Sequence, residues 1–214
     1  MNKTIEEKLN EGRQYRMIDL TEFDHRADDG GEKVVEGYAS TFNQPYTLYK
    51  KDNVTIREQV DPAAFNETDM SDVIMQYDHQ GRVFARITNG TLEVTPDEQG
   101  LRIRASLGGT TLGRQLYEEI DGGYTTKMSF GFTVTGEKND RQDNEDGSIE
   151  VLRTITSIGK LYDVSAVSIP ANDATTISAR SYGEGVVTGI LEEIEQQNIR
   201  KEKIKRIKLM AKEI

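Results

Sequence analysis

The chain has 214 residues, enough for one domain of ordinary size with additional segments, and it contains no cysteine, which excludes disulfide bonds, thiolate metal sites and cysteine nucleophiles. Its formal net charge is -10, so it gains little from phosphate contacts, and general nucleic-acid binding is not expected. No apolar run approaches the roughly 20 residues that cross a bilayer, and the charged first residues lack an apolar signal segment. We therefore expect a protein that is neither membrane-bound nor exported.

The pattern of apolar and polar residues changes after about residue 32. Residues 1–32 are predicted to form a polar arm, with a short helix near Ile5 to Leu9. From Val34 onwards, short segments alternate apolar and polar residues, which is typical of strands with one buried face. Turn-forming Gly, Asn, Asp and Pro residues separate these segments. Many short strands close together predict a barrel or a sandwich, and we assign this β-rich domain to residues 33–181.

Two short helices are expected within the β-rich domain. Asp61 precedes a proline, the pattern of an N-cap followed by proline at the first helical position. A second helix is predicted over residues 111–120, with Leu112, Leu116 and Ile120 on its buried face.

A helical tail is predicted over residues 182–214. Its apolar residues recur at helical spacing after the glycine-containing segment 181–185, which is expected to be a hinge. From Arg200 to the end there are seven Lys or Arg residues against two Glu residues. This charge favours an acidic partner helix that recruits the chain, and later self-cleavage near the hinge. A helix that only packs on its own domain is the alternative.

Metal-binding motifs fail in this sequence. In the acidic segment 138–148, the EF-hand pattern would place Gln142 at the first ligand position and Arg153 at the last. The two histidines, His25 and His79, have no cysteine to complete a zinc site. We expect no metal and no cofactor.

Three segments carry candidate catalytic side chains. His79 ends the expected strand VIMQYDH at the rim of a sheet, where a histidine bonded to a turn is the alternative. Ser129 shares a strand face with Gly131, which leaves room for a substrate backbone, and a solvated hydroxyl is the alternative. Asp163 interrupts an apolar strand, where a carboxylate is costly unless it is paired, and an exposed strand edge is the alternative.

In this order, QYDHQ, SFGF and LYDVSAVSIPAND resemble the motifs of the prohead maturation proteases of tailed bacteriophages, serine peptidases related to the herpesvirus assemblin proteases. The resemblance covers about residues 33–180 and includes EGYASTFNQPY, VDPAAF and GLRIRASL. It implies His79 as the catalytic histidine, Ser129 as the nucleophile and Asp163 as the acid, which is often glutamate in the family. The FARI segment lacks the glycine that usually precedes the family's arginine, so Arg86 is given no catalytic role.

The resemblance implies an α+β fold, an antiparallel β-barrel flanked by a few helices, here with a C-terminal amphipathic helix. It implies a serine endopeptidase that cleaves the major capsid protein or its scaffold segment, and also itself, during prohead maturation. Its expected location is the host cytoplasm, inside the assembling prohead. Other copies of the chain are expected partners, whereas nucleic acid and membranes are not.

In the implied chemistry, His79 takes the proton of Ser129, and Asp163 fixes the imidazole. A non-catalytic β-barrel interaction or capsid-assembly module is the alternative from another class, and a separation beyond about 6 Å between Ser129 Oγ and the His79 ring would favour it. An esterase is disfavoured because no G-x-S-x-G motif occurs. Ser165 is the next candidate nucleophile.

Overall fold

The computed structural model of the chain describes residues 5–19, 24–27, 33–167 and 173–210. The strands are β1 (Gln14–Asp19), β2 (Asp24–Ala27), β3 (Lys33–Thr41), β4 (Tyr46–Lys51), β5 (Val54–Val60), β6 (Ile74–Tyr77), β7 (Gln80–Arg86), β8 (Leu92–Pro96), β9 (Gly100–Ser106), β10 (Lys127–Asp143) and β11 (Ile149–Val167). The helices are α1 (Ile5–Asn10), α2 (Thr111–Asp121) and α3 (Asp173–Met210), with 3-10 turns at Pro62–Phe65 and Ile87–Asn89. The fold is therefore mixed α+β and rich in strands, as predicted.

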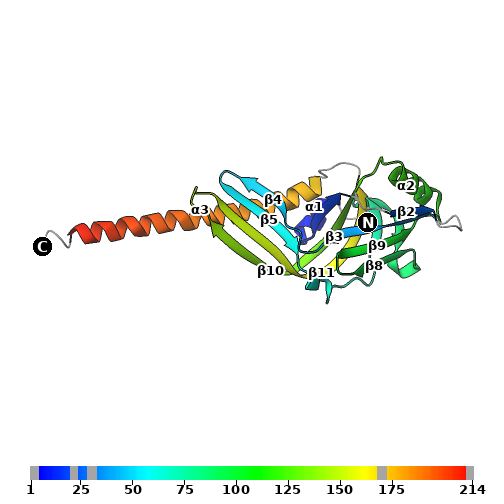
Figure 1. Ribbon diagram of the computed structural model, residues 1–214, viewed down its shortest axis with the longest axis horizontal. Coiled ribbons are helices and arrows are strands. Elements are labelled where there is room, and N and C mark those ends of the chain that lie inside the picture. The colour runs from blue at the N-terminus through cyan, green and yellow to red at the C-terminus, as the bar shows by residue number, and fades with distance from the viewer. Residues whose placement is uncertain (1–4, 20–23, 28–32, 168–172, 211–214) are drawn as a thin grey trace.

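The strands form two sheets (Figure 1). The larger sheet has the order β1-β10-β11-β5-β4, and the β6–β7 hairpin pairs with β11; the smaller has the order β2-β3-β9-β8. The alternating sequence becomes alternating burial, so that Val54, Ile56 and Val60 of β5 are all buried. One apolar core joins the sheets, with Ile103 from the smaller sheet and Phe130 from the larger.

Strand direction and closure depart from the predicted antiparallel barrel. Most pairs are antiparallel, but β11 pairs in parallel with β5 along its first half and with β6 near its end. The chain leaves β5, passes through the 3-10 turn and rejoins β11 as β6 without reversing direction. Period-two alternation reports the buried face of a strand and not its direction, so the sequence could not show this. Pairing among the described residues gives two sheets without a closed ring, and closure into a barrel stays a prediction.

Helix α3 bridges the two edge strands of the larger sheet. It contacts both β1 and β4, and its Tyr182, Val187 and Ile190 pack in a second apolar cluster with residues of β4, β5 and β11. Arg141 near the tip of the β10–β11 hairpin binds Glu193 of the helix at 3.1 Å. Beyond this contact, α3 projects away from the rest of the molecule (Figure 1). The larger sheet therefore covers the apolar side of the first half of α3, and the amphipathic pattern that predicted the helix is seen in this half.

The predicted hinge at residues 181–185 is wrong, because α3 runs without interruption from Asp173 to Met210. Gly183 faces the Tyr49 ring, and a Cβ added there would lie 2.3 Å from Tyr49 Cγ. The glycine thus permits close packing of a helix on a strand instead of marking a bend. Burial of the neighbouring apolar side chains offsets the roughly 1 kcal/mol that a glycine costs within a helix.

Replacing Gly183 with alanine is expected to lower the free energy of unfolding by about 1–3 kcal/mol, because the new methyl group overlaps the Tyr49 ring. Gly185 is a matched control in the same helix, since an added Cβ there meets nothing within 4 Å. Gly185→Ala is expected to raise the free energy of unfolding by roughly 0.5–1 kcal/mol. Urea unfolding of the two variants measures both changes, and equal effects would contradict the packing role of Gly183.

The N-terminal segment is more than a polar arm. The expected short helix is present as α1, but residues 14–19 form β1, which pairs with β10 in the larger sheet. Tyr15 is fully buried and Arg16 is 2% exposed. The alternation extends over only a few residues with charged neighbours, which gives too weak a periodic signal to predict a strand. The division of the chain into segments 1–32, 33–181 and 182–214 stays a prediction.

Both helices expected in the β-rich domain are present. The first is a 3-10 turn capped by Asp61, and the second is α2. Leu116 and Ile120 are buried as predicted, whereas Leu112 is 40% exposed. Residues four apart advance by about 40° more than one helical turn, so the first of three such residues leaves the buried face.

Candidate active site

His79 lies in the two-residue turn between β6 and β7. Asp78 and His79 have φ angles of 48° and 57°, and the flanking Tyr77 and Gln80 pair across the hairpin. Such turns require left-handed backbone at both loop positions, which Asn and Gly adopt most easily. Other residues held there are strained by about 1–3 kcal/mol, a strain that persists where the surroundings fix it and that clusters at functional sites. The unusual backbone of His79 therefore favours a functional role.

Ser129 and Asp163 come from the two adjacent long strands of the larger sheet. In the register of β10 and β11, Ser129 pairs with Ser165, and Gly131 pairs with Asp163. Residues opposite each other in a sheet present their side chains on the same face. The parallel pairing of β6 with the end of β11 brings the His79 turn next to this face. Thus the sheet register brings the three sequence-predicted site residues together.

The three side chains form a hydrogen-bonded chain. His79 Nε2 lies 2.6 Å from Ser129 Oγ, and His79 Nδ1 contacts Asp163 Oδ2. An ionised carboxylate can only accept, so Nδ1–H donates to Asp163 and Nε2 accepts the Ser129 proton. This tautomer is the one that lets a histidine act as a base toward the serine hydroxyl.

Asp163 is held as an anion in spite of its burial. Burial raises the pKa of Asp163, but its interactions with His79, a hydrogen bond from Ser165 and the charge of Arg13 lower it, and the pKa lies below its usual value. Ser165 Oγ donates to Asp163 Oδ2 at 2.9 Å. Ser165 thus orients the carboxylate in this arrangement, and the hydroxyl that contacts the histidine ring is that of Ser129.

Gly131 makes room for the site, although not in the way the sequence suggested. A Cβ at Gly131 would lie 2.6 Å from Asp163 Oδ1 and 2.9 Å from Tyr15 Cε1. The space beside Ser129 that was expected to receive a substrate backbone is therefore occupied by the Tyr15 ring. This ring also lies against His79, with 4.4 Å between the ring centroids.

Sequence reasoning missed the N-terminal residues that contact the site. Lys8 Nζ donates to the backbone oxygen of His79 at 2.9 Å. The Arg13 guanidinium lies 3.8 Å from Asp163 Oδ1 and stacks on the Tyr162 ring at 3.6 Å from its centroid. Burial is the main cause that lowers the pKa of Lys8. The available signal was the short alternation of Tyr15 and Met17 with polar residues, which charged flanks obscured.

The other residues considered from sequence lie elsewhere. His25 belongs to β2 of the smaller sheet, where its backbone pairs with Val35. Arg86 forms an ion pair with Asp72. Within the described ranges, no group of three or more His, Asp or Glu residues is placed to hold a metal ion. No helix in the described part of the chain is both long enough and apolar enough to cross a membrane.

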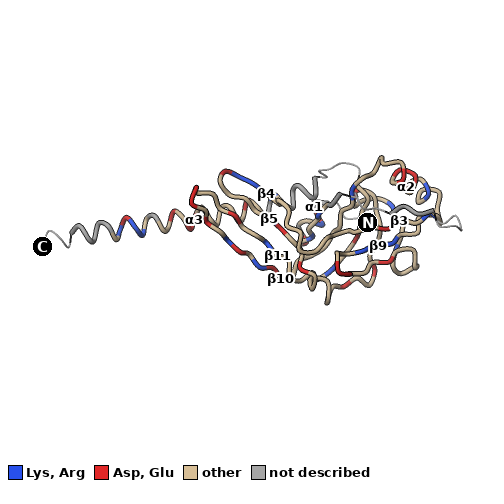
Figure 2. Tube along the Cα trace, viewed as in Figure 1, with Lys and Arg blue, Asp and Glu red and all other residues tan. Residues whose placement is uncertain are grey.

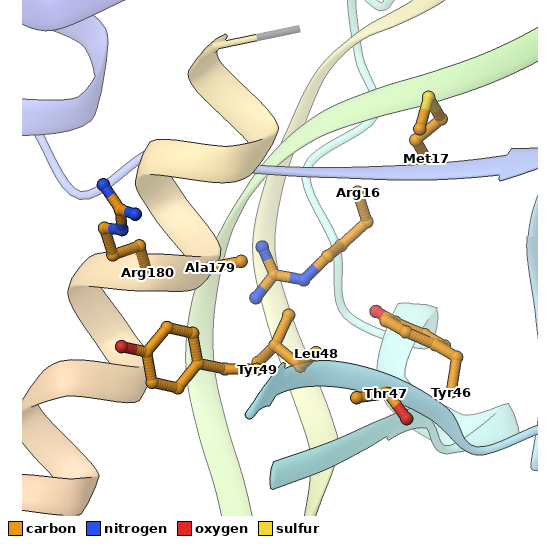
Figure 3. A pocket seen from close by; sticks show the side chains of 8 residues that line it. All are labelled: Arg16, Met17, Tyr46, Thr47, Leu48, Tyr49, Ala179 and Arg180. Carbon is orange, nitrogen blue, oxygen red and sulfur yellow. The ribbon is translucent and has the colours of Figure 1, made fainter. Parts of the chain in front are cut away.

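A cavity of about 330 Å³ lies between β1, β4 and α3 (Figure 3). Its lining includes Arg16 and Met17 from β1, Tyr46 and Tyr49 from β4, and Arg180 from α3. The side chains of Arg16 and Met17 point in opposite directions from β1 (Figure 3). None of the three candidate catalytic residues lines this cavity, which instead borders the outer side of β1.

Comparison with known proteins decides the family. Residues 21–186 match the model of the caudovirus prohead serine proteases, which is more than half of the chain. The chain belongs to this family. The prohead protease family acts in phage capsid assembly, and the matched residues include His79, Ser129 and Asp163. The bacteriophage T4 capsid assembly protease gp21 is a solved structure similar to this chain, with 13% identity and a TM-score of 0.41 over 74% of this chain and 99% of that chain. No curated protein gives a significant match.

Proposed function

We propose that this prohead protease cleaves peptide bonds with Ser129 as nucleophile, His79 as general base and Asp163 as the residue that orients His79. The observation that carries the proposal is the continuous hydrogen-bonded chain from Ser129 through His79 to Asp163. A serine hydroxyl is a weak nucleophile at neutral pH and needs such a base. The 2.6 Å contact of Ser129 with His79 also argues against a non-catalytic module, which a separation beyond about 6 Å would favour.

In the proposed reaction, Ser129 Oγ attacks the scissile carbonyl carbon while its proton moves to His79 Nε2. The imidazolium that forms is stabilised by the anionic Asp163 on its other side. His79 then gives the proton to the leaving amine as the C–N bond breaks, which leaves an acyl-enzyme. Water, deprotonated by His79, hydrolyses the ester and regenerates Ser129.

The proposed substrates are the major capsid protein or its scaffold segment, inside the assembling prohead in the host cytoplasm. This assignment rests on the family, whose members act on proheads. Self-cleavage is proposed as well, but the segment 181–185 is a poor site for it. That segment is helical, and Gly183 is packed on Tyr49, whereas proteases require extended and accessible chain.

The far part of α3 is proposed to engage an acidic partner helix during assembly. Ile199 and Ile204 are 41% and 44% exposed, and Arg200, Lys201 and Lys203 are exposed beside them. Figure 2 shows charged residues along this projecting part of the helix. A lone helix gains little stability in water unless a partner covers its apolar residues. Other copies of the chain are the alternative partner.

Co-expression with the capsid protein and its scaffold segment tests the proposed function. Mass spectrometry of the purified shells is expected to find new protein termini that are missing when the protease gene is omitted. The new termini also give the cleavage motif. Intact capsid and scaffold proteins in shells that contain the protease would contradict the proposed activity.

A further inference from the structure

The proposed catalytic residues are shut off from solvent. Ser129 and His79 are 0% exposed, and Asp163 is 1% exposed. A polypeptide substrate must bring its carbonyl carbon within about 3–3.5 Å of the serine oxygen before it can react. The arrangement described above is therefore a closed state, and some part of the chain must leave before a peptide can bind.

One segment, residues 7–19, provides the cover. It comprises the end of α1 and all of β1, and it touches each of the three catalytic residues. Met17 of β1 pairs with Ser129, the Tyr15 ring lies against the His79 ring, and Arg13 faces the Asp163 carboxylate. Because paired residues share a face, Tyr15 and Met17 lie on the face of the sheet that carries Ser129 and Gly131.

We propose that residues 7–19 occupy the outer edge of β10 and keep the protease closed until they are displaced. The inference rests on the proposed role of Ser129. Once β1 is displaced, the edge of β10 offers unpaired backbone groups to an extended peptide, which can add to the sheet as a new strand beside the nucleophile. The segment thus competes with substrate for one edge.

The position of β1 at the margin of the sheet supports this inference. Among the described strands, β1 pairs only with β10, so it is held by backbone hydrogen bonds on one side. On its other side β1 contacts α3, and the 330 Å³ cavity between them leaves part of that side unpacked. The residues that the family model matches begin at 21, after β1.

A buried ion pair holds β1 in place in the closed state. Arg16 binds the buried Glu58, and burial would raise the pKa of Glu58, but Arg16 and Arg153 lower it below its usual value. When Arg16 leaves, Glu58 keeps its contacts with Arg153 and Tyr46, but Arg153 also binds Glu137, so two carboxylates then share one guanidinium. Loss of this buried ion pair opposes spontaneous release, and the pairing of a substrate strand with β10 must offset it.

The closed state also holds two buried oxygen atoms that lack a hydrogen bond of good geometry. Among the described side chains, the Tyr15 hydroxyl and Asp163 Oδ1 are buried and make no hydrogen bond. Burial is the main cause that raises the pKa of Tyr15 to about 12. Arg13 is the nearest cation to Asp163 Oδ1, at 3.8 Å, which is too long for a hydrogen bond. Poorly satisfied buried atoms disfavour the closed state, and water or a peptide can bind to them once the segment leaves.

A disulfide lock tests the inference, because the wild-type chain has no cysteine that would interfere. Asp19 pairs with Lys127 at the end of the β1–β10 ladder, and paired residues lie within the Cα separation that a disulfide spans. The variant Asp19→Cys, Lys127→Cys would be oxidised and exposed to a fluorophosphonate probe, with labelling of Ser129 followed by mass spectrometry. Labelling is expected to be at least tenfold slower in the oxidised form than after reduction.

Lys50→Cys with Thr55→Cys is the matched control. These residues pair across β4 and β5, so their disulfide leaves β1 free, and oxidised and reduced forms are expected to label at equal rates.

As a second measurement, residues 20–23 would be replaced with the recognition sequence of a specific protease and cut after folding. Cutting is expected to accelerate labelling of Ser129 at least tenfold, because the segment can then dissociate.

The two measurements separate this inference from the proposed function. Equal labelling of locked and reduced forms, or no acceleration after cutting, would overturn the role of residues 7–19 while leaving Ser129 as nucleophile. Absence of Ser129 labelling in every form, the cut form included, would contradict the proposed function and this inference with it.

Discussion

Replacing Ser129 with alanine is expected to abolish cleavage of capsid proteins, with a loss of about 10⁵- to 10⁶-fold in turnover. Removal of a serine nucleophile leaves only the residual catalysis that comes from binding and from the other polar groups of the site. The substitution deletes one hydroxyl from a strand and leaves the apolar side of β10 unchanged, so the variant is expected to fold. Gel analysis of capsid proteins after co-expression measures the loss, and circular dichroism checks the fold.

Ser165→Ala is the matched control for this variant. Ser165 is also buried, lies directly opposite Ser129 in the strand register and donates a hydrogen bond to Asp163. Its loss is expected to reduce turnover by about 10- to 150-fold, far less than the loss of the nucleophile, because one hydrogen bond to a charged group contributes roughly 1.5–3 kcal/mol. Normal processing by Ser129→Ala together with none by Ser165→Ala would reverse the assignment of the nucleophile.

The sequence predicted the three candidate residues because each of them departs from the alternating pattern of its strand or lies beside a departure from it. His79 follows the last alternating residue of a strand, Ser129 shares its face with a glycine, and Asp163 interrupts an apolar run. Their meeting could not be derived from those patterns, since it depends on the register of β10 with β11 and on the parallel entry of β6. Register and strand direction are set by contacts between distant segments, and the resemblance to a family supplied what alternation could not.

The two main errors have one physical origin, which is packing between segments far apart in the sequence. The glycines of segment 181–185 predict a hinge because glycine weakens an isolated helix, but contact with the Tyr49 ring makes Gly183 a position where only glycine fits. The charged neighbours of residues 14–19 predict that these residues belong to a polar arm. Pairing with β10 and the contact of Arg16 with Glu58 instead make them a strand in which Tyr15 and Arg16 are buried. In both cases the partner that decides the structure is distant in sequence: Tyr49 for Gly183, and β10 and Glu58 for residues 14–19.

Replacing Asp163 with asparagine is expected to lower turnover by about 10⁴-fold, the size of the effect in the well-studied serine–histidine–aspartate proteases. The amide can donate its N–H to His79 Nδ1, which favours the tautomer that carries its proton on Nε2 and so cannot accept from Ser129. The measurement is turnover on a peptide taken from the mapped capsid cleavage site.

The pH dependence of the free energy of unfolding provides a second readout, since the pKa of Asp163 is lowered in the folded state. Its contribution is present above the unfolded pKa of about 3.9 and is lost as the pH falls through the folded value, whereas the asparagine variant has no such dependence.

Asp163→Glu separates the role of the charge from that of the side-chain length. Glutamate keeps an anionic acceptor for His79, so its turnover is expected to lie between those of the wild type and the asparagine variant. The site is tight, however, because Asp163 is 1% exposed and its Oδ1 would lie 2.6 Å from any Cβ at Gly131. One extra methylene group is therefore expected to lower the free energy of unfolding by about 1–3 kcal/mol. If the asparagine variant instead turns over as fast as the wild type, Asp163 is a structural residue, and Asp78 or a water molecule must orient His79.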